Sequence, residues 1–374
     1  MDEGCSSRAG RLTVSGLRAQ CDIRIGFPRG DEGTPAQWLR TIADYLENED
    51  VADEIYLTGK LAEKLERYCA DVLGKPAALW FPTGTMAQAA AALIHADATG
   101  RKILALHPTS HLLLHEDDGA QKLLKLDVAI MGEWPRVIDA RAVQALDVDP
   151  ACGFIELPQR HNGGLCPDWE TLTGAVSAIH SRGARAHMDG ARLWSTREAL
   201  GGRSYADICA PFDSVYATFY KEIGALGGAI LAGEADFIAQ AKLWRHRQGG
   251  LLIRGWPMIA DALRCLPRAI DAMPGCIAAA REIAGQIRNI GFEIEPWPVQ
   301  TSMFHVRLPL TKAEFAALRD AIARETNVWI GGSGWELDGR PGMSLEIAVD
   351  AQLAAADRGR LVEAFAVLRH RIAA

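Results

Sequence analysis

Short apolar runs alternate with helical stretches through the middle of the chain, and this alternation constrains the fold more than any other feature. The segments follow one another at 77–81, 86–96, 102–106, 112–114, 127–131, 152–157, 168–182, 184–188, 214–219 and 229–232. Strands that alternate with helices are typical of a mainly parallel sheet covered by helices. In such a sheet, ligands bind where the strands reach their carboxyl ends. The sequence therefore predicts an α/β fold with its site at one edge of the sheet.

Two of these runs lead to charged side chains. The run 214–219 leads to Lys221 and a glycine-rich turn, and the run 184–188 ends on Asp189, three residues before Arg192. A lysine at a strand end is held by its backbone and partly desolvated, and such an amine can form a Schiff base. The plainer alternatives are a solvated lysine in a hairpin turn and a surface salt bridge for the arginine.

A third feature is the turn Thr83-Gly84-Thr85, which joins the buried run 77–81 to an alanine-rich helix. Backbone N–H groups and hydroxyls at a helix N-terminus bind phosphate, and glycine lets the backbone come close to it. A simple helix N-cap would have the same geometry. Pyridoxal phosphate needs an amine for its aldehyde, a carboxylate for its ring nitrogen and donors for its phosphate. The three features together suit that cofactor.

The order of these motifs resembles the threonine aldolase and β-eliminating lyase family of pyridoxal-phosphate enzymes. The resemblance spans residues 50–260, and it rests on Thr83–Met86, then Ser110-His111 followed by Glu116, then His187–Arg192, then the strand-end lysine. It implies the fold of the fold-type-I enzymes, which is a mainly parallel, seven-stranded-type sheet covered by helices with a smaller α+β domain at the C-terminus. It also implies pyridoxal 5'-phosphate as cofactor and a homodimer or homotetramer.

The resemblance also implies a role for each matching residue. Lys221, Asp189 and His111 would be catalytic and would contact the cofactor, with the imidazole stacked on its ring. The cofactor phosphate and the substrate would be held by a further set, namely Thr83, Gly84, Thr85 and Arg254 for the phosphate and Arg192, Tyr56 and Gln159 for a small amino-acid substrate. Arg192 would contact the cofactor as well as the substrate. The expected reaction cleaves the Cα–Cβ bond of a β-hydroxy-α-amino acid to glycine and an aldehyde.

The chain departs from the family at three places. A serine that helps to bind the substrate carboxylate is missing from Arg24–Phe27, and an arginine near the C-terminus is replaced within Ser344–Glu346. Where the family has a histidine before a Gly-Gly turn, this chain has Gln159, with His161 two residues later. We consider three arginines as replacements for the lost carboxylate contacts, namely Arg24, Arg160 and Arg340.

Several alternatives stay open at this point. The same cofactor supports β-elimination, transaldolation and transamination, and a catalytically silent homologue would keep the fold alone. His187 and Asp189 share one face of a strand, and His111 and His115 lie one helical turn apart beside Glu116, so a metal site must be considered. Neither group has the spacing of a known metal motif, and the preferred interpretation contains no metal.

Composition excludes several classes of protein. A net charge of -7 argues against a nucleic-acid-binding protein, and no apolar run is long enough to span a membrane. Eight cysteines without a Cys-x-x-Cys pair fit a reduced, cytoplasmic protein. At 374 residues the chain is long enough for two domains, and the sequence predicts an N-terminal arm over 1–35, a large cofactor-binding domain over 36–266 and a small domain over 267–374.

Overall fold

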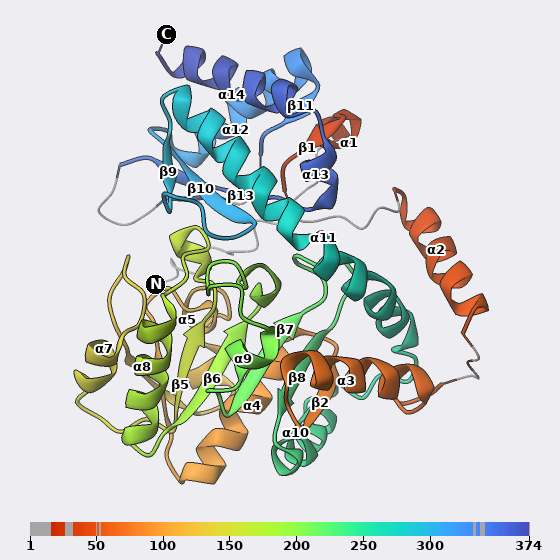
Figure 1. The fold of residues 1–374 in the computed structure, drawn as a ribbon, viewed down its shortest axis with the longest axis vertical. Coiled ribbons are helices and arrows are strands. Elements are labelled where there is room, and N and C mark those ends of the chain that lie inside the picture. The colour runs from red at the N-terminus through yellow and green to blue at the C-terminus, as the bar shows by residue number, and fades with distance from the viewer. Residues whose placement is uncertain are drawn as a thin grey trace, which may run out of the picture.

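A seven-stranded sheet forms the centre of the larger part of the molecule (Figure 1). The computed structural model describes residues 16–26, 33–49, 51, 54–331, 334–336 and 341–373. The strands lie in the order β2-β8-β7-β6-β5-β3-β4. Their bounds are β2 (Ala77–Phe81), β3 (Ile103–Leu106), β4 (Asp127–Ile130), β5 (Cys152–Glu156), β6 (Arg185–Gly190), β7 (Ser214–Thr218) and β8 (Ala229–Gly233).

The sheet is mainly parallel, as the alternation of strands and helices predicts. The five strands from β4 to β7 pair in parallel, whereas β8 runs antiparallel to both of its neighbours, β7 and β2. Consequently β2 points the same way as β7, and the segments after both strands reach the same edge. The predicted fold class is confirmed.

Helices cover both faces of this sheet. On one face Leu79, Tyr216 and Leu231 pack against α4 and α10, while Trp80 and Ile230, one residue away, pack against the helices of the other face. Because side chains alternate across a strand, a strand buried on both faces needs a continuous apolar run. The main helices are α2 (Pro35–Glu47), α3 (Lys60–Leu73), α4 (Gly84–Thr99), α8 (Trp169–Ser181) and α10 (Ala235–Arg247), and the shorter ones are α5 (His111–Leu114), α6 (Gly119–Lys122), α7 (Ala140–Gln144) and α9 (Tyr205–Cys209).

A smaller sheet forms the C-terminal part. Its strands lie in the antiparallel order β12-β13-β10-β9. The bounds are β9 (Glu293–Glu295), β10 (Met303–Leu308), β12 (Gly334–Glu336) and β13 (Met343–Ala348), with helices α12 (Lys312–Thr326), α13 (Ala351–Ala355) and α14 (Arg358–Ala373). A separate core of this part includes Phe304, Leu345 and Phe365.

The N-terminal segment joins the smaller part. After α1 (Gly16–Gln20), the strand β1 (Ile23–Arg24) pairs in parallel with β11 (Val328–Trp329). This pairing carries the chain toward the junction of the two sheets. Most of the predicted N-terminal arm lies outside the described residues, as do Phe27 and Arg340.

One long helix, α11 (Trp256–Asn289), contributes to both cores. Its first half places Ile259 and Leu266 in the core of the larger part, and its second half places Ile283 and Ile287 in the core of the smaller part. Pro267 and the second proline, Pro274, lie inside this helix, because burial on both sides outweighs the lost hydrogen bonds. The division of the chain into two domains at residue 267 remains a prediction.

No helix in the described part of the chain is long and apolar enough to cross a membrane.

Candidate active site

A pocket lies where the parallel strands reach their carboxyl ends. Asp189 is near the end of β6 and is in register with Glu156 of β5 and Tyr216 of β7, and Lys221 follows β7 by three residues. The predicted residues that line this pocket are Thr85, His111, Asp189, Arg192 and Lys221. Residues from four separate stretches of sequence therefore meet at one place.

Asp189 is buried, with 3% of its surface exposed. The side chain Nε2 of Gln88, on α4, donates to Oδ2 at 3.0 Å, and the backbone N–H of Ala191 donates to Oδ1 at 3.2 Å. Each oxygen of a carboxylate can accept more than one hydrogen bond. The carboxylate is thus fixed in place and keeps the capacity to accept a further donor from the pocket.

Lys221 lies in a mostly buried position beside Tyr220, with Nζ 5.8 Å from the centre of the phenol ring. Burial and the positive charge of Arg192 lower the pKa of Lys221 to about 8, against the opposing effect of Asp189. A lowered pKa favours the neutral form of an amine, which is the nucleophilic form. The expectation of a partly desolvated lysine agrees with this environment.

The turn before α4 serves two purposes. Thr83 is the N-cap of the helix and its Oγ1 accepts from the backbone N–H of Met86 at 3.2 Å, whereas Thr85 lines the pocket. A Cβ atom on Gly84 would lie 1.8 Å from Oη of Tyr216, so a glycine is required for this close approach. The first N–H groups of a helix have no partner within it, and those of Gly84 and Thr85 therefore remain for an anion.

Three imidazoles line one side of the pocket. His111 Nδ1 lies 3.0 Å from Oε1 of Glu116, and His115 Nε2 lies 2.8 Å from Nε2 of His161. Burial lowers the pKa of His115 to about 4, together with the charge of His111, and that of His161 to about 3, together with the charge of Arg160. Both rings are therefore neutral near pH 7. His161 lies in the pocket although Gln159 occupies the place where the family has its histidine.

Glu156 is a pocket residue that the sequence analysis did not select. Its Oε1 accepts from the backbone N–H of Arg160 at 3.1 Å, while Oε2 is buried and has no partner within the described chain. Burial and the neighbouring charge of Asp189 raise the pKa of Glu156 to about 7. Its position at the end of a buried strand, like that of Asp189, was the signal that could have revealed it.

Besides Thr83 and Gly84 of the turn before α4, three more predicted residues do not line this pocket in the described chain. Gln159 is buried and its Oε1 accepts from Nδ2 of Asn162 at 2.6 Å. Tyr56 and Arg254 are exposed, and their loops are joined by a hydrogen bond from the backbone N–H of Tyr56 to the carbonyl of Ile253 at 2.9 Å. The roles expected for these three residues remain predictions.

An ion cluster adjoins the pocket at the place where the family has an arginine. Arg160 donates to both oxygens of Glu346, from Nε at 2.7 Å and from a terminal nitrogen at 3.3 Å. A terminal nitrogen of Arg192 lies 3.6 Å from the same carboxylate. Burial alone would raise the pKa of Glu346, but the two guanidinium charges lower it to about 2.

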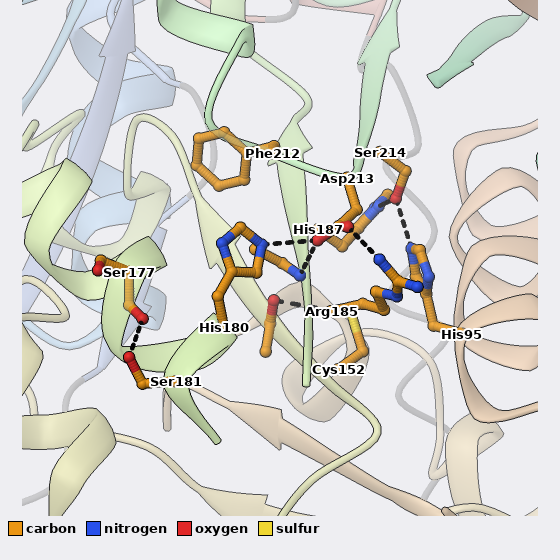
Figure 2. A network of polar contacts seen from close by, with 12 residues as sticks. His95, Cys152, Ser177, His180, Ser181, Arg185, His187, Phe212, Asp213 and Ser214 are labelled. Carbon is orange, nitrogen blue, oxygen red and sulfur yellow. Dashed lines mark hydrogen bonds and ion pairs between the residues drawn. The ribbon is translucent and has the colours of Figure 1, made fainter. Parts of the chain in front are cut away.

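The residues of the alternative metal sites make other contacts. His187 Nδ1 lies 2.7 Å from Oγ of Ser214 (Figure 2), and Asp189 is bonded to Gln88. Among the described residues, no group of three or more His, Cys, Asp and Glu side chains is arranged to hold a metal ion.

The comparison with protein families gives a decisive match. A family model described as Beta-eliminating lyase matches residues 34–309. This chain belongs to the beta-eliminating lyase family. It is accordingly a pyridoxal-phosphate-dependent lyase, as the order of its motifs predicts.

Named relatives support this membership. The chain is 26% identical over 299 residues to a probable low-specificity L-threonine aldolase 2 of Arabidopsis thaliana, covering 77% of this chain and 83% of the relative. It is 28% identical over 272 residues to the low specificity L-threonine aldolase of Escherichia coli K12, covering 69% and 78%. A solved structure from Listeria monocytogenes EGD-E, provisionally assigned as an L-allo-threonine aldolase, is 32% identical with a TM-score of 0.86, covering 95% and 97%.

The pocket of this beta-eliminating lyase fits pyridoxal phosphate by its own chemistry. Lys221 offers an amine with a lowered pKa, and Asp189 offers a carboxylate that can accept from a ring N–H. The N-terminus of α4 offers N–H groups and the Thr85 hydroxyl to a phosphate. The donors and acceptors that the cofactor requires are therefore all present on one chain.

Proposed function

We propose that this lyase cleaves the Cα–Cβ bond of a small β-hydroxy-α-amino acid and releases glycine and an aldehyde. The observation that carries the proposal is the presence of Lys221, Asp189 and His111 around one pocket. The threonine aldolases among its relatives support the choice of reaction. The closest competing reaction is β-elimination, which the same pocket chemistry supports.

When bound, pyridoxal phosphate supplies an electron sink for the negative charge that bond cleavage leaves at the substrate α-carbon. Lys221 would hold the cofactor through its side-chain amine. Asp189 would keep the ring nitrogen protonated, which its bonds to Gln88 and Ala191 favour by fixing both oxygens. Arg192 would orient the substrate carboxylate, because its planar fork matches that group.

Cleavage also needs a base for the proton of the β-hydroxyl group, and we assign this role to His111. The carboxylate of Glu116 can only accept a hydrogen bond, so Nδ1 of His111 must donate to it. Nε2 is then the ring nitrogen that is left to accept a proton. His115 and His161 remain neutral near pH 7 and would hold the hydroxyl group in place.

We further propose that the enzyme works in the cytoplasm as a homodimer or homotetramer. The seven described cysteines are free and buried, which supports a reducing compartment. Ile55, Tyr56 and Ile253 expose 43%, 47% and 54% of their surfaces, and a second copy of the chain would cover such a patch. Tyr56 and Arg254 would then complete the pocket of the partner chain. Sedimentation of the purified protein tests the assembly.

The reaction is tested by incubating purified, cofactor-loaded protein with threonine and with phenylserine. We expect acetaldehyde or benzaldehyde to form together with an equal amount of glycine. If serine-type substrates instead yield pyruvate and ammonia and no aldehyde is released, β-elimination is the activity. A protein that takes up cofactor, shows its visible band and turns over neither class of substrate would be the catalytically silent homologue.

A further inference from the structure

A second pocket adjoins the first on the side of the smaller sheet. Its charged lining residues are Arg192, Lys221, Glu222, Glu346 and Asp350, and Gly26 and Ser302 also line it. Arg192 and Lys221 line both pockets, so the two spaces meet at these side chains. Gly26 comes from the segment in which the family carries a carboxylate-binding serine. A substrate carboxylate bound by Arg192 would therefore lie next to Glu346.

Arg160 is the more strongly engaged of the two arginines that face Glu346. Two of its nitrogens donate to Glu346, and the guanidinium carbon lies 4.7 Å from the ring centre of Trp335. The side chain is 15% exposed. The bidentate contact with Glu346 matches the positive charge of Arg160 with a negative one. Although Arg160 lines the first pocket, its charge is already paired, so it attracts a second carboxylate less than an unpaired guanidinium would.

Arg192 is engaged much less. Its ion pair with Glu346, at 3.6 Å, is the only polar contact of its guanidinium in the part of the chain that the structure describes. Its side chain is 8% exposed, and it has five N–H donors. A buried guanidinium with free donors requires an anionic partner. One substrate carboxylate would meet this requirement.

The charges around the second pocket favour the binding of one substrate carboxylate and disfavour the binding of two. Arg160 and Arg192 both face the ionised carboxylate of Glu346, so these three side chains together carry one net positive charge. Glu222 lines the same pocket, with Oε1 accepting from Ser302 at 3.2 Å, and burial raises its pKa to about 7, so it carries part of a negative charge near pH 7. With Lys221 holding the cofactor, a second carboxylate would approach Glu346 without a further cation among the described residues that line this pocket.

We propose that Glu346 makes this a one-carboxylate site, so that the enzyme accepts monocarboxylic β-hydroxy-α-amino acids and rejects substrates with a second carboxylate in the side chain. This inference rests on the proposed function, because it places the substrate carboxylate at Arg192. Glu346 acts as a positioning and specificity-determining residue, since it neutralises Arg160 and holds Arg192 without contacting the reacting atoms.

The test measures binding without chemistry. Titration calorimetry of the cofactor-loaded enzyme compares butyrate with succinate, which have equal carbon chains and neither of which carries an amine. We expect the wild-type enzyme to bind butyrate at least as tightly as succinate. Glu346→Gln should raise the affinity for succinate on the order of tenfold and that for butyrate much less, because a second guanidinium charge is uncovered.

Two further variants make the comparison specific. Arg160→Gln combined with Glu346→Gln leaves one guanidinium, so it should restore the wild-type preference. Glu198→Gln removes a carboxylate that pairs with Arg281 at the surface, and it should change neither affinity. Circular dichroism and the visible cofactor band show whether each variant is folded and loaded.

The proposal is overturned if Glu346→Gln changes both affinities equally, or if the double variant still favours succinate. Should Glu346→Gln fail to fold, the wild-type comparison decides, because a wild-type enzyme that prefers succinate contradicts the proposal. These binding measurements involve no turnover. If no aldehyde were released, the proposed reaction would be refuted, but the affinities for butyrate and succinate would still test whether the site accepts one carboxylate or two.

Discussion

The two ends of the large sheet carry similar side chains that differ in how far the protein satisfies their hydrogen-bonding capacity. At the amino end, Asp213 precedes β7 and accepts from Arg185 at 2.9 Å, from His180 at 2.8 Å and from the backbone N–H of Ala186 at 2.8 Å (Figure 2). At the carboxyl end, Asp189 accepts from one side chain and one backbone N–H. One carboxylate is saturated by the protein, and the other retains the capacity to accept from a ligand.

The same difference holds for the neighbours of these two carboxylates. Near the carboxyl end, Glu156 Oε2, Gln88 Oε1 and Glu222 Oε2 are buried and without a hydrogen-bond partner in the described chain. At the amino end, Oγ of Ser214 bonds the rings of both His95 and His187, at 2.6 and 2.7 Å, although His187 Nε2 is itself unpartnered. Buried polar groups are normally satisfied, so an accumulation of unsatisfied ones marks the end that receives a ligand.

The largest effect is expected from removing Lys221, the lysine at the carboxyl end. Lys221→Ala should abolish the visible cofactor band and lower aldehyde release by about four orders of magnitude. Lys75→Ala is the matched control, because Lys75 also has a pKa lowered by burial but donates to the carbonyl of Phe212 at 2.6 Å at the amino end. The visible cofactor band of Lys75→Ala and its activity per folded molecule should be unchanged. Absorption spectra and initial rates decide, and a band retained in Lys221→Ala would contradict the site.

A paired replacement of the two aspartates separates ligand binding from stability. Asp189→Asn should lower kcat/KM by about a hundredfold or more, because the ring nitrogen loses its anionic partner. Asp213→Asn should instead lower the free energy of unfolding by about 2 kcal/mol, because three donors lose their charged acceptor. Chemical denaturation and steady-state kinetics of both variants provide the measurement. If both variants lost activity to the same degree, the contrast between the two ends would be incorrect.

The pH dependence of cofactor uptake follows from the lowered pKa of Lys221. Only the neutral amine attacks an aldehyde, so uptake by the cofactor-free protein should slow about tenfold for each pH unit below about 8 and level off above it. The growth of the visible band after mixing measures this rate. A rate that stops changing only near the usual lysine pKa of about 10.4 would show that burial does not activate this amine.

The smallest effect is expected within the turn before α4. Thr85→Ala should weaken cofactor binding about fivefold through the loss of one hydrogen bond to the phosphate. Thr83→Ala should lower the free energy of unfolding by about 1 kcal/mol through the loss of the N-cap and affect binding less. Fluorescence titration with pyridoxal phosphate and thermal unfolding compare the two. Equal losses of affinity would mean that the turn acts as one unit.

The sequence predicts the positions of the strand ends well, because the pattern that marks a strand end lies within a few neighbouring residues. A buried run that stops at a charged residue shows where a parallel strand ends, and Lys221 and Asp189 were predicted on that basis. Thr85 was predicted from the turn at a helix N-terminus and His111 from the order of family motifs, and the structure brings both to the same pocket. Fold class was predictable for the same reason, since strand and helix periodicities can be read from short windows.

Contacts between distant stretches could not be read in this way. The pairing of Arg160 with Glu346 joins residues 186 positions apart, and it depends on how the smaller sheet packs on the larger one. His161 was displaced by two residues from its expected place, and only the turn geometry shows that its ring reaches the pocket. The continuity of α11 was also hidden, because Pro267 signals an interruption that packing on both sides overrides.

The unbroken course of α11 makes the geometry of the site sensitive to chain length far from it. At 1.5 Å and 100° per residue, one amino acid inserted between Met273 and Cys276 would advance everything beyond it by about 1.5 Å and turn it by about 100°. The strand that bears Glu346 would then point away from Arg192. Even a whole added turn, which restores the direction, would shift the smaller sheet by about 5.4 Å along the helix axis, so the loops around this enzyme can change length more readily than this helix.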